Sequence, residues 1–358
     1  MDKEQSIIIK GIAILMMLFY HLFGIDNINE LCKSFIYINH LPLAHYLSHA
    51  AYPVSFFLIL SGYGLTFVYN HQGLNFGKQL KRISKIYVNY WIILAIYIAL
   101  AAYVRPGYIN TDILHVVCNI TAFYCTWNGE VWFLFPYTML SLTAVFIIRK
   151  IYSFTTIKRA FTYALLYIVA FILIKVIPFP EQRRVLICYL QVIYYIQLLF
   201  YFSLGVFMYI IYDHKEAVMV TIRKHVPNAL KKYHINTICS LLAFMSIKSL
   251  FKITIADGIY AFIFILLFNR LQINRHLRKA LIILGKYSMQ MWMIHTILCV
   301  YLFHSFIYSF KYPIIIFTVL VTASFISAYV ISKVANKVTT IMLPAVFPSS
   351  RDNSDNKS

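Results

Sequence analysis

Residues Ile7–Phe23 read IIIKGIAILMMLFYHLF, an apolar run that contains a lysine, Lys10, and a histidine, His21. A helix needs about 20 mostly apolar residues to cross a bilayer, and the surrounding segment 5–24 meets that requirement. An ionisable side chain inside a bilayer is costly, so it faces the interior of a helix bundle or a water-filled cavity and commonly serves a function. The stretch therefore predicts a membrane-spanning helix that carries a pair of functional side chains.

The composition of the whole chain agrees with this interpretation. Of the 358 residues, 61% are hydrophobic and 17% aromatic, whereas only 12% are charged. Soluble domains carry about 25% charged residues, so an ordinary soluble protein is excluded. The net charge of +20 does not indicate nucleic-acid binding, because the basic residues gather in short loops between apolar segments, as they do in membrane proteins.

Ten segments are long and apolar enough to be predicted as spanning helices, and these are 5–24, 52–69, 83–104, 130–149, 159–177, 191–212, 235–252, 255–270, 281–304 and 313–335. The apolar segment 111–126 is shorter and has polar flanks, so we expect a re-entrant or interfacial helix there. The predicted fold class is all-α: a polytopic membrane protein with about ten transmembrane helices and one short additional helix. Residues 1–335 form a single integral-membrane domain in this interpretation, and residues 336–358 form a polar tail.

Basic residues are distributed unevenly between alternate loops. One set of loops carries Lys78, Lys81, Arg82, Lys85, Arg149, Lys150, Lys158, Arg159, Lys215, Arg223, Lys224, Lys231, Lys232, Arg270, Arg275, Arg278 and Lys279. The opposite set carries only Lys33, Arg105, Arg183, Arg184 and Lys311, with Lys252 at the edge of a span. Because basic loops remain in the cytoplasm, this distribution predicts that both termini and the polar tail are cytoplasmic.

Lys10 and His21 project from the same face of the predicted first helix. A separation of eleven residues corresponds to about 1100° of rotation, within about 20° of three full turns, and to a rise of about 16 Å. In the functional interpretation, Lys10 holds an anionic ligand near the cytoplasm, and His21, whose ordinary pKa is about 6.5, moves protons deeper in the membrane. The structural alternatives are that Lys10 reaches the lipid headgroups and that His21 makes an interhelical hydrogen bond.

Five stretches resemble, in the same order, the membrane-bound acyltransferase family 3. KGIAILMMLFYH (Lys10–His21) is similar to its first helix, in which ten residues separate an arginine or lysine from a following histidine. The others are FFLILSGYGL (Phe56–Leu65), RISKIYVNYW (Arg82–Trp91), WNGEVWFL (Trp127–Leu134) and LGKYSMQMWMIH (Leu284–His295). The resemblance extends from about residue 5 to 335. Several branches of the family have arginine where this chain has Lys10, and lysine lacks the bidentate fork that suits a phosphate.

The family is known for O-acylating bacterial surface polysaccharides. The resemblance therefore implies an enzyme of the bacterial inner membrane that uses acyl-CoA, usually acetyl-CoA, as its donor on the cytoplasmic side. The acceptor is expected to be a sugar hydroxyl of an exported or lipid-linked glycan, with the polysaccharide assembly machinery as a candidate partner. No permanently bound cofactor or metal ion is expected. His45 and His49 have the i, i+4 spacing of metal ligands, but no matching third ligand accompanies them.

Ester formation needs a base for the attacking hydroxyl and an acid that orients this base. His21 is the candidate base, or it carries the acyl group transiently. We expect Glu130 to orient His21. Asp26 is the alternative acid because it is closer than Glu130 to His21 in sequence. The structural explanation of Glu130 is that its carboxylate stabilises the start of a helix.

The remaining site predictions concern the donor and the acceptor. The candidate phosphate contacts are Lys10, Lys81, Arg82 and Lys85, although the basic loop residues also follow from topology alone. The candidate substrate contacts are Ser61, Tyr63, Trp132 and His295, with Ser288 on the same helix face as His295. Helix packing is the alternative explanation for these residues.

Two other classes of function are also compatible with the sequence. A membrane transporter or glycan flippase could use Lys10 and His21 as a substrate or proton path, although no repeat symmetry between the two halves supports it. A non-catalytic member of a polysaccharide assembly complex is the third possibility, but scaffolding requires no buried ionisable pair.

Overall fold

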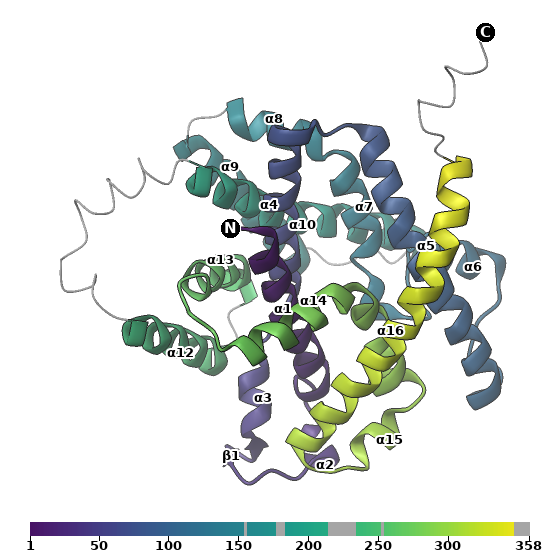
Figure 1. Cartoon of the computed structure of the whole chain (residues 1–358). Coiled ribbons are helices and arrows are strands. Elements are labelled where there is room, and N and C mark those ends of the chain that lie inside the picture. Colours follow the sequence, from purple (N-terminus) through teal and green to yellow (C-terminus); the bar gives the residue numbers. More distant parts are fainter. Residues whose placement is uncertain (154–155, 177–182, 214–233, 252–253, 347–358) are drawn as a thin grey trace.

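The computed structural model describes residues 1–153, 156–176, 183–213, 234–251 and 254–346 (Figure 1). These residues form helices almost throughout, and the described part contains a single small sheet in which β1 and β2 are antiparallel, with Tyr37 opposite Pro42. The elements are α1 Lys3–Phe23, α2 Ile28–Leu31, β1 Tyr37–Ile38, β2 Leu41–Pro42, α3 Leu43–Ser48, α4 Val54–Gln72, α5 Phe76–Val104, α6 Ile113–Ile120, η1 Gly129–Val131, α7 Leu134–Leu142, α8 Ala144–Ser153, α9 Thr156–Val176, α10 Arg183–Asp213, α12 His234–Leu250, η3 Thr254–Ala256, α13 Asp257–Phe268, α14 Arg275–Thr296, η4 Ile297–Tyr301, α15 His304–Tyr308 and α16 Pro313–Val346.

The all-helical prediction is confirmed, but the number of spans is not. Within the described residues, four helices are long and apolar enough to cross a membrane, namely α1, α5, α10 and α16. The bent pair formed by residues Gly129–Leu142 and Ala144–Ser153, which meet at 61°, makes a fifth if it counts as one span. The predicted spans 235–252 and 255–270 are helices of only 17 and 12 residues. At about 1.5 Å per residue, 12 residues rise about 18 Å, well short of a hydrocarbon core of about 30 Å.

Two other predicted segments also differ in detail from the structure. The segment 111–126 contains the short helix α6, as expected, but α6 covers only eight residues. The last helix, α16, continues to Val346 and so includes the first residues of the predicted polar tail. The basic loop at 215–232 and the tail from residue 347 lie outside the described residues.

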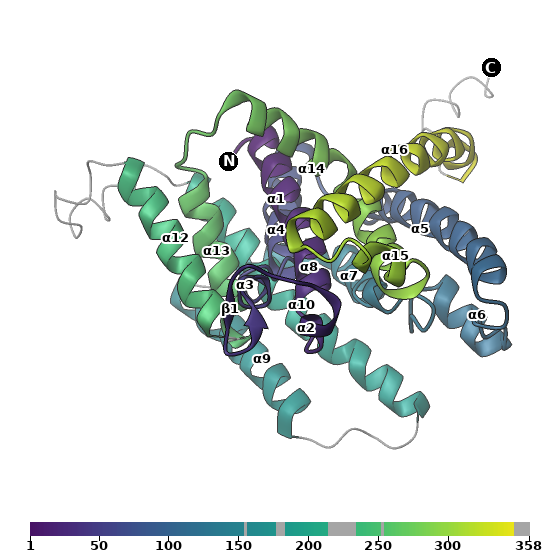
Figure 2. The same ribbon diagram turned by 90° about the horizontal axis from the view of Figure 1, so that it is seen from below.

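Helices α1 and α14 run parallel through the centre of the molecule and touch along their length (Figures 1 and 2). At one end, Arg278 Nε donates a hydrogen bond to Glu4 Oε1 at 2.6 Å, between positions 274 apart in the chain. The same offset relates Gly11 to Gly285 and His21 to His295. The basic start of α14 therefore lies beside the start of α1, as the predicted orientation of both spans requires.

Two glycines allow this close approach. A Cβ atom on Gly11 would lie 2.2 Å from the carbonyl oxygen of Leu281, and one on Gly285 would lie 2.0 Å from the carbonyl oxygen of Ile7. Backbone atoms cannot move aside as a flexible side chain can, so only glycine fits at these positions. Small residues at crossing points are the usual means by which membrane helices approach each other.

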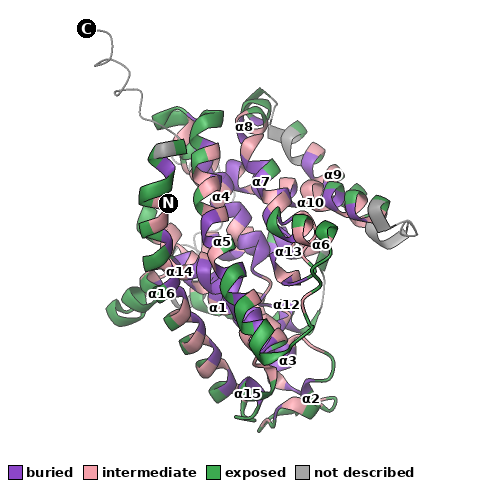
Figure 3. Cartoon of the chain, turned by 90° about the vertical axis from the view of Figure 1, so that its right-hand side faces the viewer, coloured by how far each residue is buried: buried purple, intermediate pink, exposed green. Residues whose placement is uncertain are grey.

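The other long helices surround this pair. Helix α4 packs against α10 on one side, and α16 crosses α14 and α5 on the other (Figure 2). Buried residues concentrate on α1, α4 and the facing side of α14, whereas α16 and α6 expose much of their surface (Figure 3). Apolar outer faces of this kind suit contact with lipid.

We predict that Gly285→Ala separates α1 from α14 and destabilises the fold. Overpacking of this kind costs about 1–3 kcal/mol, so the melting temperature of the full chain in detergent should fall by several degrees. The matched control is Gly64→Ala, because no atom lies within 4 Å of the position that its Cβ would take. Equal melting temperatures for the two variants would contradict the role assigned to the glycine contact.

Candidate active site

Glu130 lies in the short 3-10 helix η1, which α14 and η4 hold in place. The hydrogen bonds across this contact run from Asn128 Nδ2 to Met293 O at 3.0 Å, from Thr296 Oγ1 to Asn128 Oδ1 at 3.0 Å and from Gly129 N–H to Tyr301 Oη at 2.8 Å. Because the Asn128 side chain is bound to α14 and the Gly129 backbone to η4, the loop that carries Glu130 has a fixed position relative to both elements.

This arrangement brings Glu130 against His21. Glu130 Oε2 lies 3.3 Å from His21 Nε2, although the two residues come from the first helix and the middle of the chain. The exposed fraction of the side chains is 17% for His21 and 34% for Glu130, so the pair is partly buried but reachable. A carboxylate at this distance holds one tautomer and orientation of an imidazole and stabilises the imidazolium when it forms.

His295 packs against His21. The two imidazole centroids are 4.9 Å apart, and His295 is fully buried. Its Nδ1 lies 2.7 Å from the carbonyl oxygen of Trp292. A carbonyl only accepts, so Nδ1 carries the proton and neutral His295 presents Nε2 as an acceptor. That Nε2 is buried and has no hydrogen-bond partner among the described residues.

A cavity of about 320 Å³ opens beside His21 and Glu130. Its other walls include Tyr20, Tyr52 and Trp132. Aromatic walls with a few convergent polar groups are typical of sites for small molecules. The imidazole–carboxylate pair therefore borders a space that a substrate hydroxyl can enter.

A second cavity, of about 630 Å³, lies on the other side of the bundle core and has a basic lining. Lys10 and Arg82 line it together with Ser61 and Tyr137. Arg82 Nη1 donates a hydrogen bond to Tyr137 Oη at 2.8 Å, and Ser61 Oγ lies 3.0 Å from the same oxygen. Lys10 makes no hydrogen bond or ion pair with the described residues, so its ammonium group is available for an anion.

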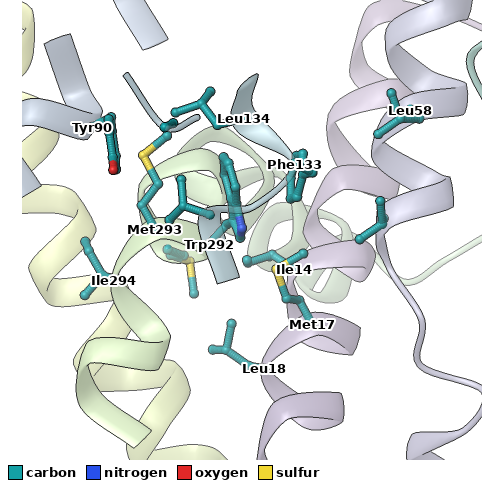
Figure 4. Packing of buried hydrophobic residues seen from close by; sticks show 14 of the residues in the cluster. Ile14, Met17, Leu18, Leu58, Tyr90, Phe133, Leu134, Trp292, Met293 and Ile294 are labelled. Atoms are coloured by element: carbon teal, nitrogen blue, oxygen red, sulfur yellow. The ribbon is translucent and has the colours of Figure 1, made fainter. Parts of the chain in front are cut away.

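Phe133 and Trp292 line both cavities and separate them. Their rings are stacked with centroids 4.1 Å apart, and both are nearly buried. Figure 4 shows them close to Ile14 and Met17 of α1, in the middle of the apolar core. The Trp292 indole N–H also donates to the carbonyl oxygen of Glu130 at 3.2 Å. The partition between the cavities is thus hydrogen-bonded to the backbone of Glu130, the residue that supplies the acid of the His21 pair.

Comparison with known proteins identifies the family of the chain. The sequence model of a family described as an acyltransferase domain matches residues 5–333, which is nearly the whole chain. The chain belongs to the acyltransferase 3 family. It is therefore an acyltransferase and a membrane protein, as the resemblance of its motifs implied. No curated protein and no solved structure matches the chain.

The structure distributes the predicted site residues of this acyltransferase over the two cavities. His21, Glu130 and Trp132 line the smaller cavity, whereas Lys10, Arg82, Ser61 and Ser288 line the larger one. His295 lines neither cavity but packs against His21. The sequence predicts Ser61 as an acceptor contact. In the structure it lines the larger cavity together with Arg82 and Lys10.

Other predicted residues lie away from both cavities. Lys81 and Lys85 are exposed on α5, and of the three basic residues in that turn only Arg82 lines a cavity. The Tyr63 hydroxyl donates to the carbonyl oxygen of Met1 at 2.9 Å, so its position has a structural reason. Asp26 is exposed beyond the end of α1.

The histidine pair with metal-ligand spacing has a structural explanation too. His45 Nδ1 lies 2.9 Å from the carbonyl oxygen of Phe23, and His49 Nδ1 lies 3.1 Å from that of Ser249. No group of three or more His, Cys, Asp or Glu side chains that could hold a metal ion occurs in the described part of the chain.

Sequence reasoning missed Tyr137, the Phe133–Trp292 partition and a buried acid, Asp257. The chain has 29 tyrosines and 29 phenylalanines, so nothing local distinguishes the ones that line a cavity. Asp257 is different because it lies within the predicted span 255–270. The rule that selected Lys10, that an ionisable residue inside a span is functional by default, also selects Asp257.

We predict that Glu130→Gln lowers kcat for acyl transfer by about 100-fold, because an amide neither stabilises the imidazolium nor fixes the same tautomer. Ester product formed by purified protein measures the effect. Asp26→Asn serves as the control for the alternative acid and should leave kcat within about twofold of the wild-type value. The opposite ranking of the two variants would refute the assignment of Glu130.

Proposed function

We propose that this acyltransferase moves an acyl group, in the simplest case acetyl, from acyl-CoA to a hydroxyl of a cell-surface polysaccharide or its lipid-linked precursor. The observation that carries the proposal is the His21–Glu130 pair at 3.3 Å beside a cavity. The second cavity, with its free lysine and its arginine, supports a donor that carries phosphates.

The larger cavity suits the donor because of its charge and its length. Lys10 and Arg82 are placed to contact the phosphates of coenzyme A, and about 16 Å along α1 separates Lys10 from His21. The pantetheine arm of coenzyme A is long, linear and uncharged, so it suits an apolar passage. Its thioester end is then directed towards Phe133 and Trp292, where the two cavities meet.

The smaller cavity suits the acceptor. Its Tyr52 and Trp132 rings offer flat faces to a sugar, and the hydroxyl of the sugar is placed beside His21. In the transfer step, His21 takes the hydroxyl proton while the oxygen forms a bond to the acyl carbon. The carbon–sulfur bond breaks, and coenzyme A leaves as a thiolate that recovers one proton, so the reaction is balanced.

The partition gives a physical reason for the use of two cavities. Water that reached the thioester would hydrolyse it, and the aromatic rings that line the point where donor and acceptor meet help to exclude water. The Trp292–Glu130 hydrogen bond couples the position of this partition to the acid of the site. In this proposal the protein lies in the bacterial inner membrane with both termini in the cytoplasm, so that the basic cavity faces the acyl-CoA pool.

We predict that His21→Ala abolishes acylation of the host's surface glycan. The measurement is mass spectrometry of that glycan from wild type, a deletion strain, and deletion strains that express His21→Ala or His71→Ala at equal abundance. His71 is exposed at the end of α4, so the second variant should restore the acyl mass. A glycan that is unaltered in the deletion strain would remove the polysaccharide from the proposal.

We predict that Lys10→Met raises the KM for acetyl-CoA by at least about tenfold, since a hydrogen bond to a charged group contributes about 1.5–3 kcal/mol. Lys81→Met and Lys85→Met are matched controls, because both remove one exposed positive charge from the neighbouring surface. Initial rates against acetyl-CoA concentration separate the variants. A similar rise in all three would show that net surface charge, rather than a contact in the cavity, attracts the donor.

A further inference from the structure

A third cavity, of about 160 Å³, adjoins the cavity of His21. Tyr52 and Trp132 line both, so the two spaces meet at these aromatic rings. The far wall comes from α9, α10 and the start of α13, which contribute Tyr167, Gln197 and Asp257. The transfer step described above uses none of these three residues.

Asp257 is the most unusual member of this wall. Its Oδ1 lies 2.9 Å from Lys248 Nζ, and the side chains are only 3% and 8% exposed. Removing two charges from solvent costs several kcal/mol per ion, and replacement of such a pair by apolar residues is often stabilising. A carboxylate offers about four acceptor sites, and Lys248 pairs with only one of its oxygens. Asp257 lines the cavity and therefore retains acceptor capacity for a ligand.

Gln197 and two tyrosines complete the polar lining. The Gln197 amide has no hydrogen-bond partner within the described part of the chain, so it can both donate to and accept from a ligand. The Tyr167 hydroxyl donates to the carbonyl oxygen of Thr254 at 3.1 Å and lies 3.3 Å from the Tyr201 hydroxyl. These contacts hold the tyrosine side chains in place, and their rings form apolar faces of the cavity.

This lining selects one chemical class of ligand. A carboxylate close to the surface repels phosphates and other anions, and the amide and hydroxyl groups are poor partners for a lipid tail. A neutral ring with several hydroxyl groups matches the lining, because its O–H groups donate to Asp257 and Gln197 and its C–H faces lie against the aromatic rings.

We propose that this cavity, which we term the second-ring subsite, binds the sugar ring adjacent to the one that receives the acyl group. The inference rests on the proposed glycan acceptor and adds that the enzyme recognises at least two linked rings. Tyr52 and Trp132 then lie at the linkage between them. A disaccharide segment is consequently a better acceptor than a single sugar.

The test compares acceptors of two lengths with the full chain in lipid nanodiscs. The host's surface glycan is deacylated with mild alkali, cut, and separated into monosaccharide and disaccharide fractions, which serve as acceptors with radiolabelled acetyl-CoA. We expect wild type to favour the disaccharide in kcat/KM. Gln197→Leu should lower the disaccharide-to-monosaccharide ratio of kcat/KM about tenfold, as expected for the loss of one or two hydrogen bonds. Gln272→Leu, at an exposed loop position, should leave the ratio at the wild-type value.

A second variant removes the carboxylate without leaving a buried charge. Asp257→Asn combined with Lys248→Met keeps the pair neutral, and a melting temperature close to that of wild type shows that it folds. We expect the same loss of disaccharide preference. A ratio equal to that of wild type in Gln197→Leu and in the folded double variant would overturn the subsite, as would a wild type that uses both fractions equally well. Transfer to neither fraction by wild type would instead reject the glycan acceptor and the subsite together.

Discussion

The contact between α1 and α14 is the constraint on which the rest of the structure depends. In lipid there is little hydrophobic gain from bringing two helices together, so close association relies on van der Waals packing and small residues. Gly11 and Gly285 allow each backbone to reach the carbonyl groups of the other helix. Because the helices are parallel and keep one offset, the histidine ten residues beyond each glycine meets its counterpart. The geometry of the candidate active site is therefore a consequence of helix register.

The same helix pair organises the space on both sides of the core. α14 carries Trp292, which stacks on Phe133, separates the two cavities and donates a hydrogen bond to the backbone of Glu130. It also binds Asn128 and thereby fixes the loop that presents the acid. One helix thus positions the partition, the acid and the second histidine. The acyl transfer proposed above, which brings a charged donor and a hydroxylated acceptor together without admitting water, would depend on this one helix.

Charged and titratable groups in the described interior are arranged according to the cost of burial. Glu130 has His21, and Asp257 has Lys248. Lys10 has no hydrogen-bond or ion-pair partner among the described residues and instead lines a cavity. This is the arrangement expected of a group that binds an anionic ligand. Glu130, Lys10 and Asp257 thus each line one of the three cavities described above, which is the physical basis for assigning functions to those cavities.

Much of the fold class and of the candidate site could be predicted from residues 7–23 and the motifs that follow. The helical period, the length of an apolar segment and its charged residues are local properties of the sequence. The sequence by itself determined the all-helical membrane class, the shared face of Lys10 and His21, the acyltransferase family and the candidate acid Glu130. Only the tertiary structure decided that Arg82 faces a cavity while Lys81 and Lys85 do not, that Ser61 lies with the basic groups and that Asp257 lines a cavity next to that of His21. These outcomes depend on helix rotation and on contacts between residues more than 50 positions apart, such as Arg82 with Tyr137. A local pattern carries no information about such contacts, because the geometry of packing specifies them.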